Sequence, residues 1–258
     1  MTLLAVAVAG RGLVDPAEPV FSAGDEALLR GGAAFETVRV YAGRPFLLDR
    51  HLGRLAHSSA ALALPAPTGV EELIRLVLTA PPPDHVLRLY RTAETLVATS
   101  SALPAGLDEL RARGLTLTSV AVGSSQLLEG VKSTSYAEAF AARRSVDSDD
   151  VLLVTGALVR ECATANIWWR RGEVLYTPAV GPGVLPGVTR SFVLDVEADV
   201  RQGTFTLDEL LSADEAFTTS SIREVMPVRR LDGRSLGGEL PGPATARLQA
   251  ALRLRSAQ

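Results

Sequence analysis

The sequence predicts an α+β fold in two domains, a small N-terminal α/β domain over residues 1–102 and a larger domain over residues 111–258. Segments in which apolar and polar residues alternate, as in a strand, are mixed with segments whose apolar residues follow helical spacing. The stretch Ser100 to Gly106 is rich in Ser, Ala, Pro and Gly, and residues 103–110 are assigned as the interdomain linker. A length of 258 residues suits one large domain or two small ones.

In the N-terminal part, the spacing of apolar residues changes after Asp49 from that of a strand to that of a helix. We expect Asp49 to cap this helix. The spacing of Thr68 and Glu71 is that of a capping box in front of a second helix. The turn Ala42-Gly43 is predicted to join two strands as a hairpin. Strands are predicted over 3–9, 34–41, 45–48, 86–90 and 95–99, and helices over 49–62 and 69–78.

In the C-terminal part, short alternating runs are separated by turns such as Thr155-Gly156 and Arg171-Gly172. A helix is expected to follow Lys132 and to end at Arg143-Arg144, where two cations suit a last turn. The strands are predicted over 115–122, 151–154, 158–161, 166–169, 174–176, 215–218 and 225–229. One further helix is predicted to start near residue 189, and another to span 244–254.

The composition is that of an ordinary globular protein, 47% hydrophobic with a net charge of −3. The sequence lacks a run of about 18 apolar residues that would span a membrane. Cys162 is the only cysteine, which excludes an internal disulfide, and no His/Cys spacing suggests a metal site. No basic block is paired with aromatic residues, so nucleic acid is not expected as a partner. We expect a cytoplasmic protein.

Lys132 is the only lysine among the 26 Lys and Arg residues. Arginine stays charged in proteins, whereas a desolvated lysine can lose its proton and act as a nucleophile. If the following helix begins at Lys132, its positive end would favour the free amine. The alternative is that an arginine-rich composition left one lysine by chance.

Three further features follow Lys132 along the chain. The loop Gly183 to Arg190 opens a helix with glycines and Thr189, which suits either a phosphate or an ordinary cap. Glu161 is an acidic residue in a run of apolar and small residues, either buried opposite a cation or at a solvated strand edge. The hydroxyls of Ser220 and Ser221 end a strand, where they would bind a ligand or form a turn.

Together these features resemble the fold-type IV pyridoxal-phosphate enzymes, or class IV aminotransferases, from about Gly24 to Pro227. This family comprises branched-chain and D-amino acid aminotransferases, (R)-selective amine transaminases and 4-amino-4-deoxychorismate lyases. The resemblance is carried, in the family's order and spacing, by FETVRVYAGRPFLLDRHLGRL, GVKSTSY, RECATANIWWRRGEVLYTP, GVLPGVTR and TTSSIREVMPV. It implies a homodimer and a larger domain with a β-barrel-like sheet and flanking helices.

The resemblance also implies pyridoxal 5′-phosphate as the cofactor and assigns residues to it. Lys132 would be the Schiff-base lysine and would move the proton between Cα and C4′, while Glu161 would keep the pyridinium nitrogen protonated. Tyr136 is a further candidate for cofactor binding: many relatives have a tyrosine near the cofactor's O3′ five residues after the lysine, whereas Tyr136 comes four after it. The implied phosphate contacts are Arg54, Val188, Thr189 and Ser221, with Leu185 packed on the ring.

Substrate choice depends on fewer residues. Arg91 lies where relatives carry an arginine for a substrate carboxylate, but the glycine and the long loop that usually follow are missing. Arg30 is a second carboxylate candidate, and Phe35 stands where D-amino acid enzymes often have Tyr. Arg88 is expected on the opposite face of its strand from Arg91.

The remodelled loop after Arg91 favours a transaminase that moves an amino group between a D-amino acid, or a related primary amine, and a 2-oxo acid. The alternative is a 4-amino-4-deoxychorismate lyase that yields 4-aminobenzoate and pyruvate, because residues 161–178 resemble the lyases most. A non-catalytic carrier of the cofactor is a third hypothesis, and the retention of one lysine argues against it.

Overall fold

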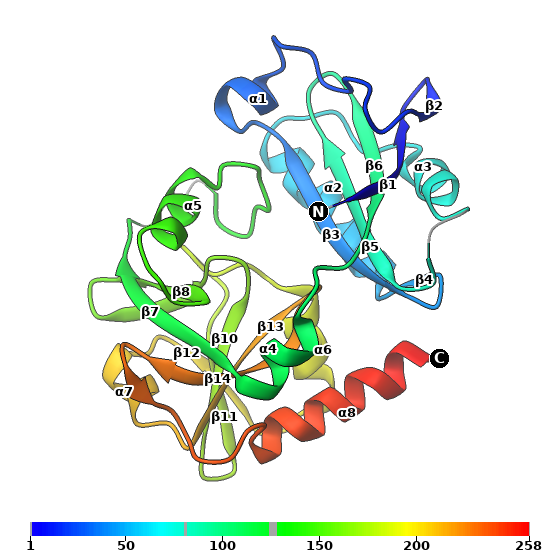
Figure 1. Ribbon diagram of the computed structural model, residues 1–258. Helices are drawn as coiled ribbons and strands as arrows, with labels where there is room; N and C mark the ends of the chain where they lie inside the picture. Colours follow the sequence, from blue (N-terminus) through cyan, green and yellow to red (C-terminus); the bar gives the residue numbers. More distant parts are fainter. Residues whose placement is uncertain (1, 80–81, 124–127, 258) are drawn as a thin grey trace. The chain divides into compact units, whose positions relative to one another are not determined.

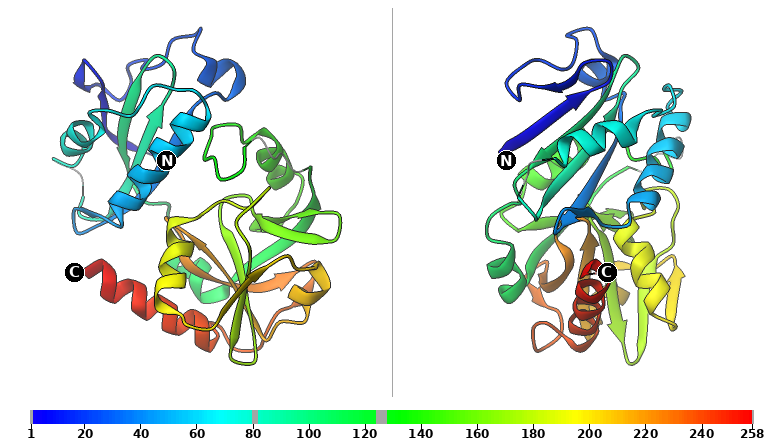
Figure 2. Two further views of the ribbon diagram at one scale, coloured as in Figure 1. Left: turned by 180° about the vertical axis from the view of Figure 1, so that it is seen from behind. Right: turned by 90° about the vertical axis from the view of Figure 1, so that its right-hand side faces the viewer.

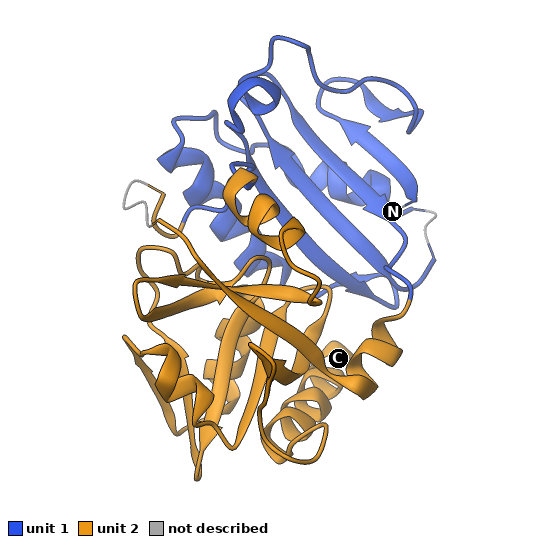
Figure 3. Cartoon of the chain, turned by 60° about the vertical axis from the view of Figure 1, so that its left-hand side comes forward, with its two compact units in different colours: residues 1–105, 131–136 blue, residues 106–130, 137–258 orange. Residues whose placement is uncertain are grey.

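The computed structural model describes residues 2–79, 82–123 and 128–257. The chain divides into two compact units (Figure 3), unit 1 with Met1–Ala105 and Val131–Tyr136, and unit 2 with Gly106–Gly130 and Ala137–Gln258. The units differ from the sequence-based domains in the segment Val131–Tyr136, which brings Lys132 into unit 1.

Unit 1 contains a six-stranded antiparallel sheet in the order β2-β1-β6-β5-β3-β4 (Figure 1). The predicted hairpin is confirmed as β3 and β4, since Val40 pairs with Pro45 and Tyr41 with Arg44. The sequence did not predict β2, whose three residues are too few to show alternation. The strands are β1 (Leu3–Val8), β2 (Gly12–Val14), β3 (Ala34–Tyr41), β4 (Arg44–Pro45), β5 (His85–Arg91) and β6 (Leu96–Ser101).

Helices α2 (Leu48–Ala61) and α3 (Val70–Val77) lie on one face of this sheet (Figure 2). Leu55 of α2 and Ile74 of α3 pack with the inward side chains of the strands. The apolar residues repeated at helical spacing and those repeated at strand spacing therefore form one shared core.

The predicted caps of these two helices are wrong. The N-cap of α2 is Leu47 at φ 50°, and Asp49 lies in the first turn. The N-cap of α3 is Gly69 at φ 83°, without a side-chain cap hydrogen bond. In both cases a residue in the left-handed region turns the chain into the helix.

Unit 2 contains a curled, mixed nine-stranded sheet in the order β12-β11-β10-β13-β14-β7-β8-β9, with β15 paired to β14. The pairs β11–β12, β7–β14 and β7–β8 are parallel, and the others are antiparallel. The strands are β7 (Leu115–Ala121), β8 (Asp150–Thr155), β9 (Leu158–Cys162), β10 (Asn166–Arg171), β11 (Val174–Pro178), β12 (Val200–Gly203), β13 (Glu215–Ser220), β14 (Glu224–Leu231) and β15 (Arg234–Ser235).

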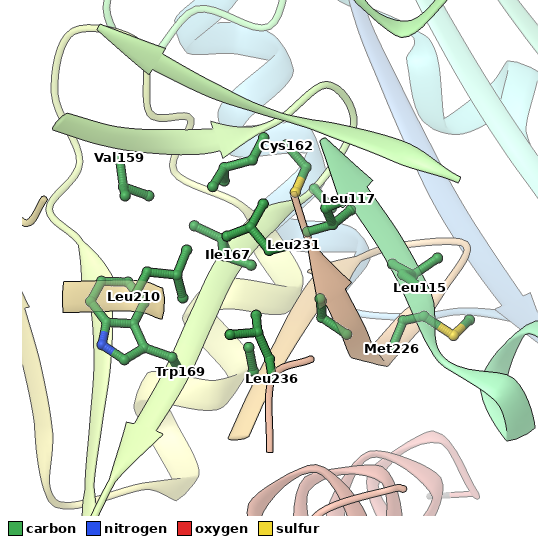
Figure 4. Close-up of a cluster of buried hydrophobic side chains, with 14 of the residues drawn as sticks. Leu115, Leu117, Val159, Cys162, Ile167, Trp169, Leu210, Met226, Leu231 and Leu236 are labelled. Atoms are coloured by element: carbon green, nitrogen blue, oxygen red, sulfur yellow. The ribbon is translucent and has the colours of Figure 1, made fainter. Parts of the chain in front are cut away.

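The inner face of this sheet forms its own hydrophobic core (Figure 4), with Trp169, Ile167 and Met226 fully buried. Cys162 lies in this cluster, and burial raises the pKa of its thiol, so that it packs as a small apolar group.

The described part of unit 2 contains the helices α4 (Leu107–Arg113), α5 (Ala137–Arg144), α6 (Val188–Val196), α7 (Leu207–Leu211) and α8 (Pro243–Ala257). The sequence did not predict α4, which overlaps the expected linker, or α7, which begins with a capping box between Thr206 and Glu209. Within the described parts of the chain, no helix is long and apolar enough to cross a membrane.

Candidate functional site

Lys132 lies in an extended segment beside the start of β3. Its carbonyl accepts a 3.0 Å hydrogen bond from the N–H of Phe35, and its own N–H donates to Ser58 Oγ at 3.0 Å. The next residue, Ser133, forms a β-bridge with Ala34. The prediction that Lys132 lies at the positive end of a helix is therefore wrong, because its carbonyl pairs with β3, its N–H binds a side chain of α2, and α5 begins only at Ala137.

The Lys132 amine lies among aromatic side chains. Nζ is 4.4 Å from the ring centroid of Phe35 and 3.2 Å from the Tyr136 hydroxyl. Phe35 also contacts Tyr136 and stacks on Tyr90, with centroid distances of 5.6 and 6.3 Å. Ring faces attract an ammonium, and a tyrosine hydroxyl can both donate and accept a proton. Unit 1 thus brings together Lys132, Tyr136 and Phe35.

Arg54, the predicted phosphate ligand, is held by a buried carboxylate that the sequence reading did not single out. Its Nε and Nη2 donate to Glu36 Oε1 and Oε2 at 2.7 and 2.8 Å, and Glu36 Oε2 lies 2.7 Å from His51 Nδ1. Side chains alternate between the two faces of β3, and Glu36 lies on the face that the helices cover. This alternation is visible in the sequence and could have predicted that Glu36 is buried.

Opposing effects set the two pKa values in this cluster. Burial raises the pKa of Glu36, but the hydrogen bonds from Arg54 and His51 and the charge of Arg54 outweigh it and lower that pKa from 4.5 to about 2. Burial lowers the pKa of His51 below 6.5, against the opposing contact with Glu36. At neutral pH the cluster therefore consists of a carboxylate, a guanidinium and a neutral imidazole that donates Nδ1–H.

The arginines considered for substrate binding lie in different surroundings. Arg91 is at the end of β5 and donates Nε to the Pro65 carbonyl at 2.8 Å. Arg30 ends the short helix α1 (Glu26–Arg30), is exposed, and forms an ion pair with Glu26. Alternation along β5 places Arg88 on the face opposite Arg91, as predicted, and on the face of Phe35.

Glu161, at the end of β9, is anchored by the loop in front of α6. Its Oε2 accepts hydrogen bonds from Asn166 Nδ2 and from the Leu185 N–H, both at 2.9 Å. Asn166 Nδ2 also donates to the Leu185 carbonyl at 2.9 Å. Asn166 approaches Gly187 so closely that a Cβ there would collide with its side-chain oxygen. The carboxylate is therefore a fixed part of unit 2.

Helix α6 begins after Gly187 with Val188, Thr189 and Arg190, all buried. The N-cap glycine supplies no side-chain cap. Arg190 was not predicted as a site residue. It donates Nη2 to the Pro178 carbonyl and to Gln202 Oε1, and burial lowers its pKa while the charge of Glu161 raises it. The Arg190 Nε has no hydrogen-bond partner among the described residues.

Ser221 lies in the turn between β13 and β14. Ser220 Oγ accepts the Arg223 N–H at 3.3 Å, and Arg223 Nη1 pairs with the buried Asp150 at 2.6 Å. Glu224 follows at φ 60°, a strained conformation for a residue other than glycine. The turn that carries Ser221 is therefore closely held within unit 2.

The described residues contain no group of three His, Cys, Asp or Glu side chains that could hold a metal ion. The reactive groups of the described residues are an amine with a hydroxyl in unit 1, and an anchored carboxylate near the start of α6 in unit 2.

Comparison with known proteins places the chain in a family. The chain is 30% identical to the aminodeoxychorismate lyase of Bacillus subtilis, over 90% of this chain and 88% of that protein. It is 27% identical to the D-alanine aminotransferase of Bacillus licheniformis, over 86% and 87%. A fold IV transaminase from Curtobacterium pusillum has a TM-score of 0.85 at 28% identity, over 95% of this chain and 91% of that one. Residues 33–231 match the amino-transferase class IV family, and the chain therefore belongs to it.

Proposed function

We propose that this protein binds pyridoxal 5′-phosphate and transfers an amino group between a D-amino acid, or a related primary amine, and a 2-oxo acid. The observation that carries the proposal is the position of Lys132 Nζ, 3.2 Å from the Tyr136 hydroxyl and over the Phe35 ring, in a chain with no other lysine. When bound, the cofactor supplies an electron-withdrawing ring that stabilises negative charge at the substrate Cα.

In unit 1, Lys132 Nζ is the nucleophile toward the cofactor aldehyde and the group that moves the Cα proton. The Tyr136 hydroxyl orients that amine and exchanges a proton with it. Arg54 contacts the phosphate. Arg91 and Arg30 are the candidates for a substrate carboxylate, and Phe35 shapes the pocket beside the amine.

In unit 2, Glu161 accepts the N–H of the pyridine ring, so that the ring nitrogen stays protonated. Its anchoring by Asn166 and by the Leu185 N–H supports this role, because a fixed acceptor needs no reorganisation. Val188, Thr189 and Ser221 contact the phosphate, which suits the start of a helix. Leu185 packs on the ring. The active protein is a homodimer in this proposal.

A second candidate is a lyase that converts 4-amino-4-deoxychorismate to 4-aminobenzoate and pyruvate. The 30% identity to the Bacillus subtilis aminodeoxychorismate lyase favours it. Both reactions need the same Cα deprotonation, so the residues around Lys132 serve either one.

One pair of assays separates the two candidates. With D-alanine as donor, the transaminase releases pyruvate only when 2-oxoglutarate is present. With aminodeoxychorismate, the lyase releases pyruvate without any 2-oxo acid. A Lys132→Arg variant keeps the positive charge but lacks a nucleophilic amine, and it should be inactive in both assays. Activity retained in this variant would refute the proposal.

A further inference from the structure

A buried cluster in unit 1 consists of Glu36 on β3 and His51 and Arg54 on α2, and we call it the Glu36 cluster. The side chains of Glu36, His51 and Arg54 are 0%, 2% and 8% exposed. The carboxylate accepts three hydrogen bonds of 2.7 to 2.8 Å, two from Arg54 and one from His51. Such a cluster is costly to bury unless every charge is paired, and here the carboxylate and the guanidinium pair with each other.

These contacts fix the direction of the Arg54 guanidinium. A guanidinium is a planar fork with five N–H donors, and binding Nε and Nη2 to one carboxylate sets its rotation. The orientation of the guanidinium is therefore set by the protein rather than by a ligand. The neutral His51 donates Nδ1–H to the same carboxylate and holds Glu36 in place.

The same elements also position Lys132. His51, Arg54 and Ser58 recur at helical spacing on the buried side of α2, and Ser58 Oγ accepts the Lys132 N–H. On β3, Phe35 lies under the Lys132 amine, and the next residue, Glu36, points to the opposite face and binds Arg54. Neighbouring positions on one strand and one helix therefore orient both the amine and the guanidinium.

We propose that Glu36 is a positioning residue that, with His51, presets the Arg54 guanidinium for the phosphate ester of the cofactor. This inference rests on the proposed function, in which Arg54 contacts that phosphate. Presetting removes the ordering cost of a long side chain when the anion binds. Glu36 thus acts through Arg54 and contributes to cofactor affinity without touching the cofactor.

The test is titration of the apoprotein with pyridoxal 5′-phosphate and, separately, with pyridoxal, which lacks the phosphate. Glu36→Gln should raise the Kd of the phosphorylated aldehyde about tenfold and that of pyridoxal less than about twofold. Glu72→Gln is the matched control, since Glu72 pairs with Arg75 on the exposed side of α3. It should leave both affinities unchanged.

A double-mutant cycle shows whether Glu36 acts through Arg54. Arg54→Gln should abolish most of the preference for the phosphorylated aldehyde, and adding Glu36→Gln should then change that preference no further. A full additional loss in the double variant would overturn the proposal, because Glu36 would act independently of Arg54.

His51 variants keep the test decisive if Glu36→Gln does not fold. His51→Leu removes one hydrogen bond to Glu36 and should weaken binding of the phosphorylated aldehyde alone, while His51→Asn supplies an N–H at a similar place and should restore it. Equal affinities in both variants and the wild type overturn the positioning role. The positioning role is also overturned if the wild type prefers the phosphorylated aldehyde and Glu36→Gln lowers the affinity for both aldehydes equally. That result would not contradict the proposed function. A wild-type protein that binds neither aldehyde overturns both.

Discussion

The hydroxyl of Tyr136 lies 3.2 Å from Lys132 Nζ, and its removal tests whether that contact matters for proton transfer. Tyr136→Phe keeps the ring against Phe35 and deletes one hydrogen bond to the amine. We expect kcat to fall roughly tenfold or more, with KM and cofactor binding little changed. Steady-state kinetics of the better substrate pair measure this, with Tyr176→Phe in the core of unit 2 as control. An unchanged kcat would remove Tyr136 from the reaction.

His51 gives a pH dependence of stability whose sign follows from its environment. Burial lowers the pKa of folded His51 below the value of 6.5 expected when unfolded. Between the two pKa values the unfolded chain binds the extra proton, so acidification favours unfolding. The contribution is fully present above pH 6.5 and is lost as the pH falls through the folded pKa, at up to about 1.4 kcal/mol per pH unit.

His51→Asn removes this titration. Urea unfolding at a series of pH values from about 7.5 to 5 should show the free energy of unfolding falling more steeply in the wild type than in the variant. Because His57 and His85 are present in both proteins, the difference isolates His51. Parallel curves would mean that folded His51 titrates like an exposed imidazole.

At the scale of single residues, the sequence singles out side chains that could carry out the chemistry, but not the contacts that hold them. Lys132 was identifiable because it is unique and Glu161 because it interrupts an apolar run. Glu36 and His51 were not singled out, since a glutamate in an alternating strand and a histidine on a helix have ordinary surface explanations. Only the pairing of β3 with the buried side of α2 brings them to Arg54.

The start of α6 depends on a close approach of the loop to β10, and this gives a prediction for that element. A Cβ on Gly187 would overlap the Asn166 side-chain oxygen and lie 3.3 Å from the Arg190 Cβ. Gly187→Ala should therefore displace Asn166 from Glu161 and from Leu185. We expect a loss of about 1–3 kcal/mol in unfolding free energy, and weaker cofactor binding.

Gly53→Ala is the control for this substitution. Gly53 lies inside α2, and apart from the neighbouring residues and backbone of that helix no described atom is within 4 Å of the position its Cβ would take. There alanine should stabilise the helix by about 0.5–1 kcal/mol. Thermal or urea unfolding would then show opposite signs for the two substitutions. Equal and small effects would mean that the loop at Gly187 adapts without cost.

The spacing of apolar residues predicted which segments are helices and which are strands, but it did not predict where they begin and end. Residues 115–121 and 166–171 are strands as predicted, because alternating or apolar β-branched and aromatic runs fit a sheet. The helix after Lys132 begins later than expected because Ser133 and Thr134 bond to residues about 100 positions away. Such pairing is invisible in a local window of sequence.

Each unit has a hydrophobic core of its own. The change of composition near residue 100 predicts a domain boundary there, and this boundary stays a prediction. The assignment of Val131–Tyr136 to unit 1 could not be predicted from the sequence, since it depends on hydrogen bonds to Ala33, Phe35 and Ser58. The curl of the large sheet was expected only through the family resemblance, which implied a β-barrel-like sheet, and its strand order was not predicted. Strand periodicity alone does not say which strands become neighbours.

Two separate cores predict that the units respond differently to a core substitution. Leu55 of α2 is fully buried in unit 1, so Leu55→Ala should cost about 2–5 kcal/mol there. The only two tryptophans, Trp168 and Trp169, are both buried on β10 in unit 2 and report on that unit alone. In urea, the far-UV circular dichroism, to which both units contribute, should show an earlier transition than the wild type, whereas the tryptophan fluorescence midpoint should shift less.

Leu152→Ala is the matched substitution in the core of unit 2, where Leu152 is also fully buried. That core surrounds Trp169. Leu152→Ala should therefore lower the urea midpoint seen by fluorescence as much as Leu55→Ala lowers the midpoint of the dichroism transition of unit 1. If Leu55→Ala moved the fluorescence and dichroism midpoints together by the same amount, the chain would unfold as one cooperative body. The two cores would then be energetically coupled, and an effect of Glu36→Gln on cofactor affinity would have to be measured well below the unfolding transition of the whole chain.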